Sequence, residues 1–142
     1  AKEAKQDLET TLKTKSDRSE IEKQIVLFLD AVDNDLNYGL ARLRMQLEME
    51  LRRILGLRDE VNFNQEKVKH FSARSLFSQF VERYPAYREV QSSFDYVLQI
   101  CNAAIHGRLI SVAYAHEALF MGFNILNELK SINGKGHLPN TE

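Results

Sequence analysis

The chain has 142 residues, of which 44% are hydrophobic, and its formal net charge is -1 at pH 7. This length suits one compact domain with a sizeable core and excludes two full domains. The balanced charge excludes a global electrostatic attraction to nucleic acid or anionic lipid, so such binding would need a local patch.

The cysteine content and the termini indicate the setting of the protein. Cys101 is the single cysteine, so no internal disulfide can form, and its apolar surroundings predict a buried, reduced thiol in a cytoplasmic protein. The sequence shows no secretory signal and no membrane-spanning run. Because the chain begins at Ala1 and opens on a polar helical pattern, we expect it to be part of a longer protein.

The first segment is weakly amphipathic. Residues 1 to 18 contain good helix formers but only Leu8 and Leu12 as large apolar residues, which predicts an exposed helical extension or linker. A capping box formed by Ser19 and Glu22 predicts that the first packed helix begins there. The acidic segment 33–35 then supplies a break and a new N-cap.

The next segment has the clearest helical pattern in the chain. Apolar residues recur at spacings of three and four over about five turns: Leu36, Leu40, Leu43, Leu47, Leu51 and Ile54. Arg44 and Glu48 form an i,i+4 pair, which is typical of a solvated outer face. Arg52 and Arg53 in the last turns are candidates for binding phosphate, and Gly56 is expected to end the helix.

The second half of the chain predicts three more helices. Residues 57–71 are polar and form a connection, and an amphipathic helix then ends before Pro85 because a proline disfavours helical geometry in the preceding residue. A further helix is expected to begin near Ala86, and Ser111 is expected to cap the last helix. In that last helix, Ala118 and Gly122 predict the close approach of a neighbouring backbone.

No segment shows sustained alternation of the strand type. The sequence therefore predicts an all-α fold, an antiparallel up-and-down bundle of four main helices over residues 19–132. Residues 1–18 are the extension, and residues 133–142 are predicted to be a flexible tail.

The best candidate for a functional site lies in the segment 94–107. Helical spacing places its polar residues in a stripe beside an apolar face: Asp95, Gln99, Asn102 and His106. Gly107 most easily adopts the left-handed conformation that ends a helix, so His106 is expected in the last turn.

Asn102 and His106 are four residues apart and share a helix face. The amide could orient the imidazole, or hold a phosphate or ribose oxygen while the histidine exchanges a proton. A purely structural role of both side chains in capping the helix end stays open. The scattered histidines and the lone cysteine lack the spacing of a zinc site, and no phosphate loop or serine nucleophile motif occurs. We therefore expect no metal and no cofactor.

The helix that ends in the segment 102–107, followed by an amphipathic helix, resembles the C-terminal half of HEPN domains (higher eukaryotes and prokaryotes nucleotide-binding). The segment 40–48 resembles the long helix that packs against the site helix in that family. The resemblance implies a helical bundle that forms a homodimer in which two site helices meet. Many members are metal-independent ribonucleases with an arginine a few residues before a histidine.

In this sequence, His106 matches the family histidine and Asn102 matches the polar residue that often follows the arginine. Cys101 occupies the arginine position, and no arginine lies between Arg88 and Arg108. The cationic half of the signature is thus absent, although Arg108 could supply it, from the partner chain in a dimer.

We expect a non-catalytic, HEPN-like dimerisation or regulatory module of a larger intracellular protein. One alternative is a metal-independent ribonuclease that uses His106 and Asn102. The other is a module that binds RNA or a nucleotide without cleavage, with the binding residues Asp95, Gln99, Asn102, His106, Arg108, Arg52 and Arg53.

Overall fold

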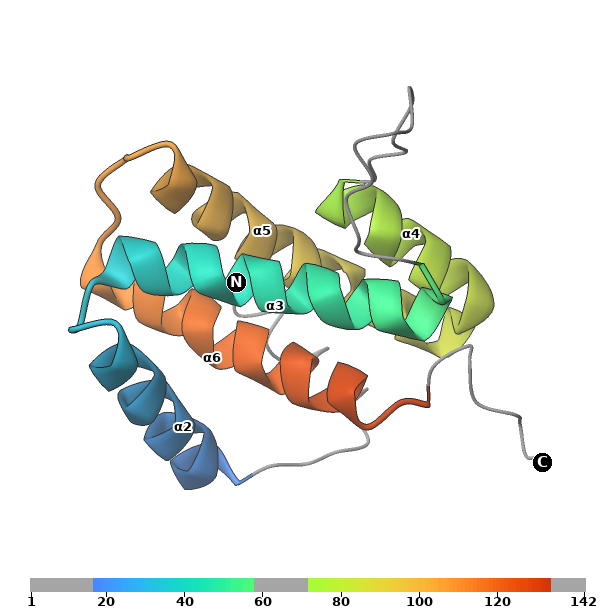
Figure 1. Cartoon of the computed structure of the whole chain (residues 1–142), viewed down its shortest axis with the longest axis horizontal. Coiled ribbons are helices and arrows are strands. Elements are labelled where there is room, and N and C mark those ends of the chain that lie inside the picture. The colour runs from blue at the N-terminus through green and yellow to red at the C-terminus, as the bar shows by residue number, and fades with distance from the viewer. Residues whose placement is uncertain (1–16, 58–71, 134–142) are drawn as a thin grey trace, which may run out of the picture.

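The structure, a computed structural model, describes residues 17–57 and 72–133, and these contain helices and no strands (Figure 1). The all-α prediction is confirmed. The helices are α2 (Arg18–Ala31), α3 (Leu36–Leu55), α4 (Ala73–Arg83), the 3-10 helix η1 (Pro85–Val90), α5 (Gln91–Ile105) and α6 (Val112–Lys130). Most of the predicted extension, the 57–71 connection and the tail lies outside the described residues.

Helix α3 lies at the centre of the bundle and packs against α2, α4, α5 and α6 (Figure 1). Asn37 at its start bonds to residues at the end of α5, so these two helices are antiparallel. Arg53 near its end bonds to Leu129 near the end of α6, so α3 and α6 are parallel. The order α2, α3, α5, α6 thus alternates in direction, and α4 with η1 is inserted between α3 and α5.

The core is built on the apolar stripe that the sequence predicts for α3. Its members Leu40, Leu43, Leu47, Leu51 and Ile54 have no exposed surface. Aromatic rings from α4 and α5 continue this core, and those of Phe77 and Phe94 stack with centroids 4.1 Å apart. Burying one such side chain contributes roughly 1.5–3 kcal/mol, so the stripe fixes α3 against its neighbours.

The caps of α3 and α6 lie at the residues that the sequence predicts. Asp35 caps α3 and its carboxylate accepts a hydrogen bond from the Tyr38 amide at 3.1 Å. Gly56 ends α3 with a left-handed φ of 73°. Ser111 caps α6 and accepts from the Tyr114 amide at 3.2 Å.

Two predicted helix starts are wrong. Asp17, and not Ser19, caps α2, and its carboxylate accepts a hydrogen bond from the Ser19 amide. The negative carboxylate also interacts favourably with the positive end of the helix dipole, which a serine hydroxyl cannot do. Residues Pro85–Val90 form a 3-10 helix, so α5 begins at Gln91 and not near Ala86.

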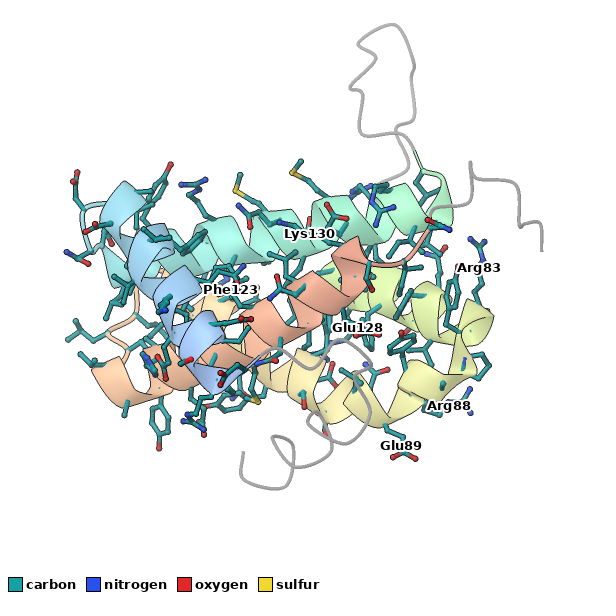
Figure 2. All side chains as sticks on the ribbon, turned by 90° about the horizontal axis from the view of Figure 1, so that it is seen from below. Arg83, Arg88, Glu89, Phe123, Glu128 and Lys130 are labelled. Carbon is teal, nitrogen blue, oxygen red and sulfur yellow. The ribbon has the colours of Figure 1, made fainter. Side chains whose placement is uncertain are left out.

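The packing of side chains into the core explains the 3-10 helix. Its tighter turn lets Tyr87 and Val90 both reach the core. The hydroxyl of Tyr87 donates to the buried carboxylate of Glu128 on α6. Arg88 and Glu89 from the same segment project outward at the end of the bundle away from the α5–α6 turn (Figure 2).

None of the helices within residues 17–57 and 72–133 combines the length and the apolar character needed to cross a bilayer.

Gly122 on α6 faces the side chain of Leu43 on α3. A Cβ atom at position 122 would lie 2.4 Å from Leu43 Cδ2. The close approach expected at this glycine is therefore real, but a leucine side chain makes it and not a backbone. Because Leu43 is fully buried, it has little room to move away.

We expect Gly122→Ala to lower the free energy of unfolding by about 1 kcal/mol or more, because overpacking outweighs the gain in helix propensity. Chemical denaturation measures this change. Gly39→Ala is the matched control, since its Cβ would lie 3.2 Å from the half-buried Leu29 and should cost less. Equal stability of Gly122→Ala and the parent would contradict the close contact.

Candidate functional site

The candidate site lies where α5 ends and turns toward α6. Gly107 has a left-handed φ of 75°. The Arg108 amide donates to the Ala103 carbonyl and the Gly107 amide donates to the Ala104 carbonyl, each at 3.0 Å. This pair of bonds is a Schellman motif. It makes His106 the C-cap residue and leaves both His106 and Arg108 exposed.

Asn37 ties this turn to α3. Its Nδ2 donates to the Ala104 carbonyl at 3.3 Å and to the Arg108 carbonyl at 3.2 Å. The last carbonyls of a helix have no partner within the helix, so an external donor stabilises them. One side chain therefore fixes both the end of α5 and the backbone of Arg108 relative to the central helix.

The polar stripe of α5 lines a pocket of about 900 Å³, a volume within the range of ligand sites. Five predicted residues line it together: Asp95, Gln99, Asn102, His106 and Arg108. Arg74 from the first turn of α4 also lines it. The structure thus brings together the α5 residues that the sequence singles out and adds a cation from another helix.

A smaller cavity of about 300 Å³ shares Arg74, Asn102 and His106 with this pocket. Arg44 and Glu48 from α3 line it as well. We call the two cavities together the α5 pocket. Three arginines from α3, α4 and the α5–α6 turn therefore line it against two carboxylates, which gives a local excess of positive charge in a chain whose net charge is -1.

Arg44 makes the contact that the sequence did not indicate. Its Nη1 donates to Asn102 Oδ1 at 2.8 Å, and its Nε donates to Glu48 Oε2 at 2.8 Å. The predicted i,i+4 pair with Glu48 is confirmed. The interpretation of Arg44 as part of a solvated face is incomplete, because the packing of α3 against α5 turns it toward the site.

Arg74 was also missed, because it precedes the apolar pattern of its helix. Its Nε lies 3.9 Å from Asp95 Oδ1, which also accepts a hydrogen bond from Gln91 Nε2 at 3.2 Å. Both members of the Arg74–Asp95 pair are well exposed, so the pair contributes little to stability. Arg74 can therefore turn toward a ligand at small cost.

Arg52 and Arg53 do not line the α5 pocket. Arg53 donates to Glu50 Oε1 at 2.8 Å and to the Leu129 carbonyl at 2.9 Å. Both arginines lie eight or nine residues beyond Arg44, which is about 12–14 Å along the helix axis. The structure thus separates them from the other candidate binding residues.

Two further titratable groups lie next to the site and are unreactive, the Cys101 thiol and the Tyr96 hydroxyl. Cys101 is fully buried, and burial raises the pKa of its thiol to about 12, while Arg44 opposes this shift. Burial and then the hydrogen bond to Glu117 at 2.6 Å raise the pKa of Tyr96 above its ordinary value. Near neutral pH both groups stay protonated, so neither is a nucleophile or a base.

Within the two described ranges, no group of three or more histidine, cysteine, aspartate or glutamate side chains is placed to hold a metal ion. No protein-family model, curated protein or solved structure matches the chain. The resemblance to HEPN domains therefore depends on the residues of the chain itself and stays a prediction.

We expect Asn37→Ala to lower the free energy of unfolding by about 1 kcal/mol, because it removes the side-chain hydrogen bonds to the Ala104 and Arg108 carbonyls. It should also speed amide hydrogen exchange at Gly107 and Arg108. Asn124→Ala is the matched control, since Asn124 donates to the Phe120 carbonyl within its own helix at 2.9 Å. If both variants behave alike, Asn37 does not fix the turn.

Proposed function

We propose that the chain is a HEPN-like module of a larger cytoplasmic protein, and that its α5 pocket binds a phosphate-bearing ligand, RNA or a nucleotide, without cleaving it. The observation that carries this proposal is the convergence of three arginines on the pocket that Asn102 and His106 line. Guanidinium groups match the geometry and charge of phosphate oxygens. The reduced, buried Cys101 suits a cytoplasmic setting.

Ribonuclease activity is the second candidate, and the position of Arg44 favours it. Cys101 stands where ribonucleases of the resembling family have an arginine. In this fold the guanidinium of Arg44 places a positive charge beside Asn102 instead. Cleavage through the ribose 2′-OH also needs a base and an acid. Among the described residues, His106 is the one histidine that lines the pocket, so this part of the chain offers one imidazole for proton transfer. Because cleavage needs both a base and an acid, a single histidine in the pocket favours binding over cleavage.

We also propose that two copies pair through the apolar tip, which we define as the exposed side chains around the α5–α6 turn: Ile105, Leu109, Val112 and Tyr114. Leu109 is fully exposed and Val112 is 70% exposed. Grouped apolar side chains of this kind mark interaction sites. A two-fold contact at the tip would bring the two copies of His106 toward one interface and would serve dimerisation or regulation.

For ligand binding, we expect the parent protein to raise the fluorescence anisotropy of a labelled single-stranded RNA of mixed sequence in EDTA. Arg108→Ala should weaken this binding about tenfold, the loss of one charge-assisted hydrogen bond. Arg53→Ala removes an arginine at the far end of α3 and should leave the affinity unchanged. A parent that binds neither this RNA nor ATP would contradict the proposal.

The same samples test for cleavage. We expect the RNA to stay intact after incubation with the parent in EDTA. Cleavage by the parent that is lost in His106→Ala would establish the ribonuclease instead.

For pairing, we expect light scattering to give the mass of a dimer for the parent and of a monomer for Leu109→Glu, because a carboxylate would be buried without a partner at the contact. Leu27→Glu is the matched control, since Leu27 on α2 is also exposed, at 71%, but lies outside the tip. A parent that is monomeric at high concentration would overturn the proposed pairing.

A further inference from the structure

The side-chain amide of Asn102 is held in one orientation. Its Oδ1 accepts a hydrogen bond from Arg44 Nη1 at 2.8 Å. The opposite orientation would place the N–H groups of Nδ2 against the N–H groups of a guanidinium, and a guanidinium has no acceptor. Asn102 Nδ2 therefore points away from Arg44, and no described residue accepts a hydrogen bond from it.

Arg44 is itself held in place. Glu48, one turn further along α3, accepts from its Nε at 2.8 Å. The two side chains are only 33% and 18% exposed, so solvent competes little for this bond. The planar guanidinium then presents a fixed fork to α5. Glu48 thus fixes Arg44, and Arg44 fixes Asn102.

We propose that Arg44 is the positioning residue of the α5 pocket, and that it turns the Asn102 amide so that its Nδ2 donors face a phosphate oxygen of the ligand. This inference rests on the proposed function. Because Arg44 holds Oδ1, Nδ2 is the side of the Asn102 amide that is left to face a ligand. Arg74 and Arg108 in the same pocket are also donors only.

The two carboxylates of the pocket already have hydrogen-bonding or charged partners. Asp95 accepts from Gln91 and lies near Arg74, and Glu48 accepts from Arg44. A ligand hydroxyl or ammonium group that needs an acceptor finds none at Asn102 Nδ2. A phosphate oxygen, which has lone pairs and no proton to donate, matches this arrangement.

The first test separates positioning from charge. We expect Arg44→Ala to weaken binding of the labelled RNA about tenfold and to increase the mobility of the Asn102 side-chain amide in ¹⁵N relaxation. Arg44→Lys keeps the charge but lacks the fork that bonds Glu48 and Asn102 together, so it should show a mobile amide and several-fold weaker binding. Arg53→Ala should change neither quantity.

The second test concerns the donor. Asn102→Asp keeps an oxygen for Arg44 to bond and replaces Nδ2 by a second oxygen. We expect this variant to be at least as stable as the parent, to lose RNA binding by tenfold or more, and to lose the parent's spectral response to inorganic phosphate. Parent-like affinity of Asn102→Asp would overturn the donor role of the amide.

The outcomes distinguish this inference from the proposed function. If Arg108→Ala weakens RNA binding while Arg44→Ala and Arg44→Lys bind like the parent, the pocket binds RNA and the positioning role of Arg44 is wrong. Parent-like binding by Arg44→Lys with a mobile amide would likewise reduce the role of Arg44 to charge. If the parent binds neither RNA nor phosphate, the proposed function fails and this inference fails with it.

Discussion

The packing of α3 against α5 is the constraint on which the rest of the structure depends. The leucine stripe of α3 is fully buried from Leu40 to Ile54, and Gly122 lets Leu43 press against the backbone of α6. The same stripe packs against α5, and this packing sets the register between α3 and α5. Asn37 then meets Ala104 near the end of α5, and Arg44, about 10 Å further along the α3 axis, meets Asn102, two residues before Ala104.

The register gives the site its rigidity. Apart from Arg108 on the α5–α6 turn, the side chains that define the α5 pocket come from helices whose apolar faces are buried, so the backbone that carries them is fixed. Asn37 holds the turn that carries Arg108, and Arg44 holds the amide of Asn102. Preorganised groups of this kind bind a ligand without a further entropy cost for ordering them.

The charge of the pocket also depends on packing. The chain as a whole has nearly equal numbers of acidic and basic residues, and its composition gives no reason to expect an anion site. Three arginines far apart in the sequence meet at the α5 pocket because α3, α4 and the α5–α6 turn converge there. A local excess of positive charge attracts anions more strongly than the net charge would imply.

The sequence by itself determined the helical elements, most of their ends, and the α5 stripe that lines the pocket. These features depend on local spacing, caps and glycine, which act over a few residues. The sequence prediction was wrong at two helix starts, near Ser19 and Ala86. Another residue caps α2, and a 3-10 helix precedes α5. Only the tertiary structure decided that Arg44 and Arg74 join the site and that Arg52 and Arg53 do not. The packing of one helix against another fixes such contacts. The spacing of residues along a single helix does not predict which residue of a second helix lies opposite.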